Sequence, residues 1–183
     1  MSRAAKILGE FLSWIVITLM IVLTVVVVVA VIYRKLGASL SWYDEVASIL
    51  LAWVTYFGAA LAALRRSHIG FDGVLIVLPM PFRLYVAYAA EVLVIAFFVL
   101  MAWAGWTVLQ VLEGETLVSL TWVPVQLTQA IIPIGAVLFI IAEILSIPDY
   151  MRDVRAGVSS EHSTMEDLVE DQLAKDREAE ERR

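Results

Sequence analysis

The sequence contains no cysteine and only two histidines, and these absences exclude several classes of protein. Without cysteine there is neither a disulfide nor a thiolate metal site. His68 follows two arginines and His162 lies in a charged tail, so no pair of histidines is available to hold a haem inside a membrane. There is also no Walker loop, GxGxxG or nucleophile elbow. We therefore expect a protein that is not an enzyme and that has no cofactor of its own.

Charge is scarce through most of the chain. Hydrophobic residues make up 61% of the sequence and the mean hydropathy is +0.85, whereas soluble proteins are roughly half apolar. The acidity gathers at one end, because residues 149–183 hold six Lys/Arg against eleven Asp/Glu. No basic patch is present, so we expect no nucleic-acid partner. The composition predicts an integral membrane protein.

Four apolar segments are long enough to cross a bilayer, which takes roughly 20 residues in a helix. A helix is the single-segment structure that satisfies its own backbone in lipid, so the fold class is predicted to be all-α. The four predicted spans cover about residues 11–33, 44–64, 83–112 and 123–147. They form a membrane domain over residues 11–148, preceded by a polar N-terminus at residues 1–10.

Local signals suggest how the spans begin and end. Ser41 is expected to cap the second span, with Asp44 reaching back in the manner of a capping box. Pro133 is expected to bend the fourth span and Pro148 to close it. These positions predict helix boundaries that the structure can test.

Two segments lie outside the predicted spans. Residues 69–82 are apolar but too short to cross, and Pro79 and Pro81 are expected to end any helix there. A short interfacial or re-entrant segment between the second and third spans fits this pattern best. Residues 149–183 are read as a charged cytoplasmic tail, either a frayed helix or disordered.

The basic residues predict the orientation, because Lys and Arg favour the cytoplasmic side of a membrane. With both ends inside, the outer loops receive only Arg34 and Lys35. The inner side then receives Arg3, Lys6, Arg65, Arg66, Arg83, Arg152 and Arg155. We therefore expect both the N-terminus and the C-terminus in the cytoplasm.

The second span carries a stripe of small and polar residues at steps of three and four, which places them on one side of a helix. The stripe consists of Glu45, Ser48, Ala52, Thr55, Ala59, Ala62 and Arg66. Association between helices in lipid relies on close backbone packing and a few hydrogen bonds. The stripe is therefore predicted to pack against a helix of another subunit.

Acidic residues at the outward end of this span have two readings. Asp44 and Glu45 begin a helix, where the dipole favours acids by roughly 0.3–1 kcal/mol. They are either capping and interfacial residues or contacts for a partner. Trp42 and Asp44 are the candidates for contact with a periplasmic partner, and Glu45 belongs to the stripe.

Two further acids, Glu91 and Glu143, lie within their apolar spans. A charge at the centre of a span costs at least about 2.5 kcal/mol, so a partner is expected for each. Arginine at the inner surface is one candidate, and a buried polar contact between subunits is the other.

Polar groups near the middle of the spans are scattered, and no internal repeat is present. They are Thr18, Thr24, Thr55, Thr107, Thr128 and Gln129. Secondary transporters usually have repeats and several converging polar groups near the midplane. These features disfavour a freestanding four-helix carrier or channel, which is the alternative to a subunit without a substrate site.

The second span and its flanks resemble the small membrane subunit of tripartite ATP-independent periplasmic (TRAP) transporters, the DctQ-like family. The residues that carry the resemblance are Trp42, Glu45, Trp53, Gly58-Ala59-Ala60, Arg65, His68-Ile69, Asp72 and Pro79, followed by Pro124 and Pro133-Ile134-Gly135. The resemblance covers roughly residues 10–148. It does not extend to the acidic tail.

The resemblance implies a multi-pass protein of the bacterial inner membrane that works as a scaffold. Its implied partners are a large elevator-type membrane subunit, a periplasmic substrate-binding protein and membrane lipids. The large subunit is expected to carry the sodium and substrate sites, and uptake of organic acids is expected to be sodium-coupled. The resemblance assigns no catalytic, substrate-binding or metal residue to this chain.

Overall fold

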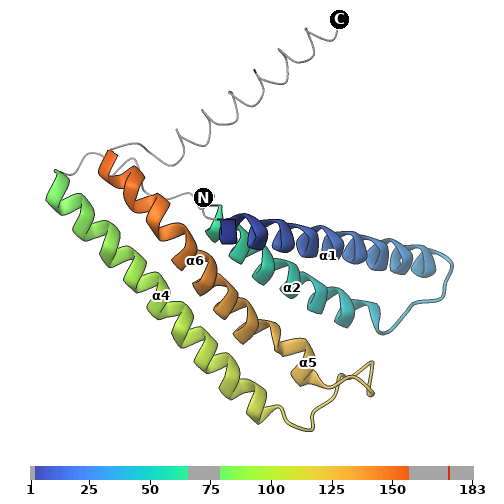
Figure 1. Cartoon of the computed structure of the whole chain (residues 1–183). Coiled ribbons are helices and arrows are strands. Elements are labelled where there is room, and N and C mark those ends of the chain that lie inside the picture. Colours follow the sequence, from blue (N-terminus) through green and yellow to red (C-terminus); the bar gives the residue numbers. More distant parts are fainter. Residues whose placement is uncertain (1–2, 66–78, 157–172, 174–183) are drawn as a thin grey trace, which may run out of the picture.

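The computed structural model describes residues 3–65, 79–156 and 173, and these residues are helical with connecting turns and no strand (Figure 1). The helices are α1 (Arg3–Lys35), α2 (Tyr43–Leu64), α4 (Met80–Val111), α5 (Val125–Gln129) and α6 (Ile131–Ala156). Four stretches are long and apolar enough to cross a membrane: Ala5–Lys35, Tyr43–Leu64, Met80–Val111 and Val125–Arg152. The predicted all-α membrane class is confirmed, while the orientation stays a prediction.

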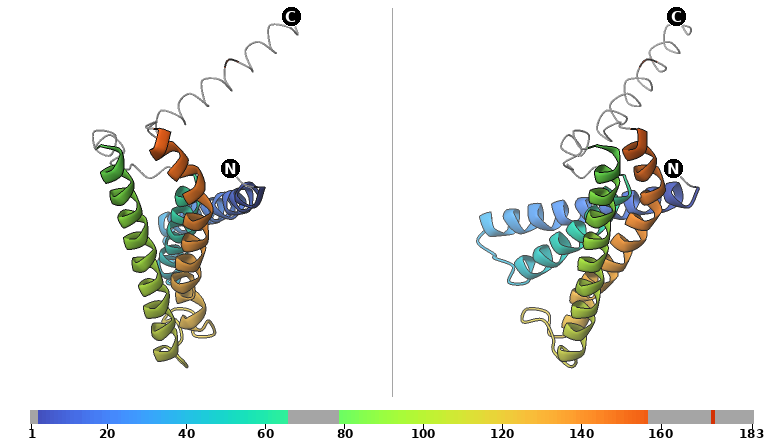
Figure 2. Two further views of the ribbon diagram at one scale, coloured as in Figure 1. Left: turned by 60° about the vertical axis from the view of Figure 1, so that its left-hand side comes forward. Right: turned by 90° about the vertical axis from the view of Figure 1, so that its left-hand side faces the viewer.

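The four long helices form an open row in the order α1, α2, α6, α4 (Figure 1). Each packs mainly on its neighbours in that row, so α1 and α4 lie at its two edges. Figure 2 shows that the pair α1 and α2 runs crosswise to the pair α4 and α6. An open row leaves much of the apolar surface uncovered by the chain itself, which suits a protein surrounded by lipid or by other subunits.

The main core joins α1, α2 and α6 and is rich in alanine. It consists of Ala5, Leu12, Phe57, Ala60, Ala63, Leu64, Ile131, Phe139 and Ala142. Alanine lets helix backbones approach closely, which is how helices associate in lipid. Phe139 of this core also stacks on Phe98, with ring centroids 3.6 Å apart, and so joins α4 to α6.

The start of α2 differs from the prediction. The N-cap is Trp42, with helical φ and ψ, and no side chain caps the helix. Ser41 therefore lies one residue outside the N-cap position, and the predicted capping box is wrong. The Ser41 carbonyl instead accepts a hydrogen bond from the hydroxyl of Ser119, at 3.2 Å.

The prolines before α4 mark its start. Pro79 is the N-cap and Pro81 lies in the first turn, where a missing N–H removes no hydrogen bond. The third long helix therefore begins at Met80, and the expectation that Pro81 would end a helix is wrong. The rest of the predicted interfacial segment, residues 69–78, lies outside the described residues.

The two prolines of the fourth span have different effects. Pro133 bends it as predicted, because α5 ends at Gln129 and α6 begins at Ile131. A proline ring clashes with the carbonyl four residues earlier, which here belongs to Gln129. Pro148 does not close the span, since α6 continues to Ala156.

Contacts beyond Pro148 explain why α6 continues. Met151 and Val154 are buried against Ala87 of α4. The guanidinium of Arg83 also donates to the carbonyl of Val154, at 3.4 Å. These contacts hold the last turns of α6 against α4, and tertiary packing thus overrides the local effect of the proline.

Candidate interaction surface

The predicted stripe on α2 lies beside the buried face of that helix. Ser48 and Thr55 are exposed, Ala52 and Ala62 are half-buried, and Ala59 packs partly on the core. Glu45 is half-buried, and Arg66 lies outside the described residues. The stripe therefore borders both the chain's own core and an open face. Whether it seats another subunit stays a prediction.

The hydroxyls on this face bond within their own helix. Ser48 donates to the carbonyl of Asp44 and Thr55 to the carbonyl of Leu51, each at 2.8 Å. Such bonds from residue i to i−4 satisfy a hydroxyl without a partner helix. The hydroxyl groups on the open face of α2 thus already donate hydrogen bonds within their own helix. The small residues on this face would let another helix approach closely.

Gly58 lies on the open side of α2, one turn before Ala62. A Cβ added at Gly58 would meet no heavy atom within 4 Å. Glycine in the middle of a helix destabilises it by about 0.5–1 kcal/mol relative to alanine. The described fold gives no packing reason for glycine here, although Gly58 does permit close approach by another helix.

Two other glycines are required by the fold itself. A Cβ at Gly135 of α6 would lie 2.7 Å from the Cβ of Tyr56 on α2. A Cβ at Gly105 of α4 would lie 3.1 Å from the backbone nitrogen of Pro133. The close approach of α6 to α2 therefore depends on glycine at position 135, and its close approach to α4 depends on glycine at position 105. The sequence showed Gly135 only as part of a family-like motif, and it gave no signal for Gly105.

Polar side chains hold the short helix α5 between its neighbours. The indole Nε1 of Trp53 donates to the carbonyl of Thr128, at 3.2 Å. The amide Nε2 of Gln126 donates to the carbonyl of Leu109, at 2.9 Å. Both acceptors lie near helix breaks or ends, where carbonyls lose helical partners. Trp53 is therefore a packing residue within the chain.

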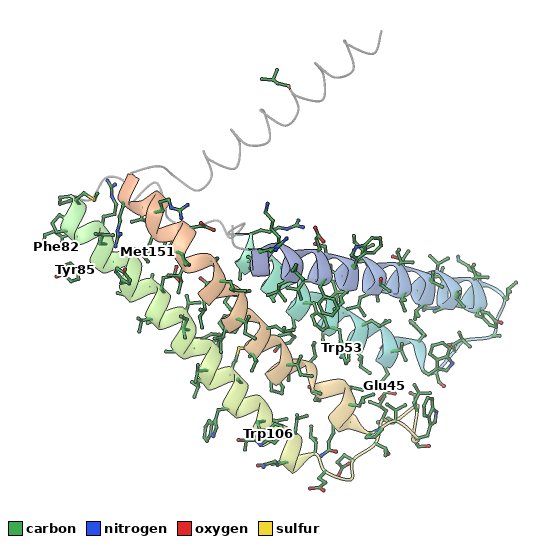
Figure 3. All side chains as sticks on the ribbon, viewed as in Figure 1. Glu45, Trp53, Phe82, Tyr85, Trp106 and Met151 are labelled. Carbon is green, nitrogen blue, oxygen red and sulfur yellow. The ribbon has the colours of Figure 1, made fainter. Side chains whose placement is uncertain are left out.

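Glu45 fixes the loop between α4 and α5 to the start of α2 (Figure 3). Its Oε1 accepts from the backbone N–H of Val118 at 3.0 Å, and its Oε2 accepts from that of Ser119 at 2.9 Å. A carboxylate bonded to two amides makes charge-assisted hydrogen bonds, which are stronger than neutral ones. Sequence reading missed this contact, because any residue except proline can supply a backbone N–H.

The loop that Glu45 holds is itself closed by backbone bonds. Leu117 N–H donates to Val123 and Val125 N–H donates to Glu115, both at 3.0 Å. Leu117 is buried, while Val118 is 89% exposed and Trp122 is 80% exposed. The loop thus presents apolar side chains at the end of the molecule where α2 begins.

Trp42 and Asp44 lie at this same end. Asp44 is exposed and Trp42 is half-buried at the N-cap of α2. Glu113 and Glu115 are exposed nearby in the loop. The proposed contact of Trp42 and Asp44 with a periplasmic partner stays a prediction.

Glu91 and Glu143 are buried between α4 and α6 of the same chain, each 6% exposed. The two helices are antiparallel, with Phe98 beside Phe139 at one level and Ala87 beside Met151 at another. Glu91 therefore lies on α4 close to the level of Glu143 on α6. The structure places this pair inside the subunit and leaves its predicted contact with another subunit without a test.

Arginines near the predicted inner surface have partners within the chain. Arg65 donates to the hydroxyl of Ser13 at 2.8 Å, which ties the end of α2 to α1. Arg152 lies 3.4 Å from the carboxylate of Asp149. In the described part of the chain, no three His, Asp or Glu residues converge as metal ligands.

Comparison with protein families gives a match over most of the chain. The model of the DctQ component of tripartite ATP-independent periplasmic transporters matches residues 23–152. This range runs from the middle of α1 to the last turns of α6 and includes the stripe and the loop held by Glu45. Comparison with curated proteins found no match.

Proposed function

This chain belongs to the DctQ family, the small membrane component of tripartite ATP-independent periplasmic transporters, and from that premise we propose that it is a non-catalytic scaffold subunit. The resemblance inferred from the sequence is confirmed by the family match. The match and the four spans make the chain a multi-pass membrane protein of a transporter. In the proposal, it supports a large elevator-type subunit that imports organic acids with sodium across the bacterial inner membrane.

One observation carries the scaffold role. The hydroxyls along the spans donate to carbonyls of their own helices, as Thr18, Thr24 and Thr107 do to Trp14, Met20 and Trp103. Substrate sites in transporters instead gather polar groups from several broken helices. These hydroxyls serve the backbone of their own helices, which supports a subunit whose task is packing.

The open face of α2 is the proposed seat for the large subunit. Ser48, Thr55 and Gly58 are small residues, so a second helix can approach this face closely. The outward end, with Trp42, Asp44 and the 113–124 loop, is the proposed meeting point with the substrate-binding protein. Sodium and substrate bind the large subunit in this proposal.

Reconstitution tests the proposal against its alternative, a freestanding carrier. The purified chain alone, in liposomes with an inward sodium gradient, is expected to give no uptake of organic acids. Adding the large subunit and the substrate-binding protein is expected to start uptake, and omission of the chain from that mixture to reduce it. Uptake by the chain alone would favour the freestanding carrier and would count against the scaffold.

A further inference from the structure

The edge helix α4 has a broad open face that turns away from α6. Figure 3 shows Phe82 and Tyr85 on this side of the helix, and Trp106 near its other end is 60% exposed. Its most exposed side chains include Tyr85, Leu93, Trp103 and Val111, between 68% and 77% exposed. Such a continuous apolar face needs an occupant outside the chain.

Aromatic residues lie at two heights along the axis of α4. Tyr85 and Tyr88 lie near one end of α4, and Trp103 and Trp106 lie near the other. Each tyrosine lies about five helical turns, roughly 27 Å, from the corresponding tryptophan. A whole number of turns puts each pair on the same side of the helix. The separation is close to the roughly 30 Å thickness of the hydrocarbon layer.

Between the two levels, every exposed side chain is apolar. These side chains are Ala89, Ala90, Val92, Leu93, Ala96, Phe97, Val99 and Leu100. Glu91, the acid in this stretch, is buried on the side that faces α6. The open face of α2 differs, because it carries the hydroxyls of Ser48 and Thr55 and turns Trp53 inward. The two faces are therefore built for different neighbours.

The helix at the other edge of the row repeats the same spacing. On α1, Trp14 is 71% exposed and Tyr33 is 45% exposed. They lie roughly 28 Å apart along this helix, which runs crosswise to α4. Tyr and Trp are enriched at the level of lipid headgroups, where an apolar ring with a polar group fits best.

We infer that the open face of α4 lies against membrane lipid, with Tyr85 and Tyr88 in one headgroup layer and Trp103 and Trp106 in the other. This face remains in contact with lipid when the transporter is assembled, a statement that rests on the proposed function. The large subunit then meets the row elsewhere, and the open face of α2 is the surface proposed for it.

The absence of cysteine makes a direct test straightforward, because a single introduced cysteine is the only thiol. Leu93→Cys reports on α4, and Thr55→Cys is the matched variant on the open face of α2. Each is spin-labelled in the full chain in lipid vesicles, and collisions with oxygen and with a water-soluble nickel chelate are measured by electron paramagnetic resonance. The measurement is made with and without the co-reconstituted large subunit.

At Leu93 we expect frequent collisions with oxygen and few with nickel, unchanged by the large subunit. At Thr55 we expect collisions with oxygen to fall severalfold when the large subunit is present. A fall at Leu93 on assembly would overturn the inference. No change at either position would uphold lipid contact for α4 and would count against the α2 surface of the proposed function.

Labels near the ends of α4 test the two levels. Labels at Phe82→Cys and Val111→Cys are expected to meet the nickel chelate more often than a label at Leu93→Cys. A label at Val111 as deep as the one at Leu93 would contradict the assigned headgroup layers. Leu100→Cys, on the same face, repeats the central measurement if Leu93→Cys does not fold.

Discussion

At the scale of single residues, Glu45 shows how one side chain serves the chain's own fold. The sequence places it in register with the α2 stripe, and the structure gives it two backbone amides of the loop between α4 and α5 as partners. Asp44, one residue earlier, is exposed. Neighbouring acids of the same sequence cluster therefore have separable roles.

Glu45→Gln is expected to loosen the loop. One carboxylate oxygen becomes an amide that opposes an N–H of Val118 or Ser119, and the local opening free energy should fall by about 1 kcal/mol. Hydrogen exchange of these two amides should then quicken roughly fivefold. Asp44→Asn is the control and should leave the exchange unchanged.

The same pair of variants is expected to differ in function. Glu45→Gln should weaken assembly with the large subunit, or uptake by the complete transporter, more than Asp44→Asn does, because Glu45 accepts hydrogen bonds from the loop whereas Asp44 is exposed. Equal uptake by both variants and the wild-type chain would remove the link between the loop and function.

Glycine positions on α2 and α6 give opposite expectations for the same substitution. Gly135→Ala should lower the free energy of unfolding by about 1–3 kcal/mol, because its Cβ would overlap Tyr56. Gly58→Ala should raise it by about 0.5–1 kcal/mol, since the Cβ meets open space. Thermal unfolding in detergent measures both. Equal melting temperatures would contradict the crossing of α2 and α6 at Gly135.

At the scale of elements, long apolar runs were sufficient to predict the four spans, because a bilayer accepts few other structures. The ends of the helices were harder to predict. Pro133 lies just after the break between α5 and α6, as expected for a proline ring that clashes with an earlier carbonyl. Pro148, in contrast, lies inside α6, where packing on α4 stabilises the helix. Ser41 is not the cap, because α2 begins one residue later than predicted, and its carbonyl accepts a hydrogen bond from the distant Ser119. Long-range contacts of this kind leave no local pattern in the sequence.

Pro133→Ala is expected to join α5 and α6 into one helix. The substitution supplies an N–H toward the carbonyl of Gln129 and removes the ring that clashes with it. The distance between spin labels at Leu127→Cys on α5 and Leu51→Cys on α2 should change measurably. Pro148→Ala is the control and should not alter it, because α6 is already continuous there. An unchanged distance in Pro133→Ala would assign the break to another cause.

At the scale of the whole molecule, the sequence predicted the type of surface better than its extent. The small-residue stripe on α2 followed from helical periodicity alone. Within the stripe, Ala59 packs on the core whereas Thr55 is exposed. This difference depends on where α1 and α6 lie, which the periodicity of α2 does not encode. The open row, with two edge helices, was not visible in the sequence, because the order of helices depends on pairings that periodicity does not encode.

Gly58→Leu tests the assembly surface directly. A large side chain should keep a partner helix at a distance and reduce co-purification with the large subunit, while the chain itself still folds. Gly58→Ala is the matched control, and Ala62→Leu on the next turn should act like Gly58→Leu. Wild-type yields of the complex with both leucine variants would exclude this face as the seat of the large subunit.

The order of the helices in the row has a consequence for biosynthesis. The third long helix, α4, rests on α6, which leaves the ribosome after it. During translation α4 must therefore wait in the bilayer, beside a finished α1–α2 hairpin, until its neighbour is inserted. Any chain interrupted in that interval carries an orphaned helix, and quality-control proteases in the membrane would meet it in that form.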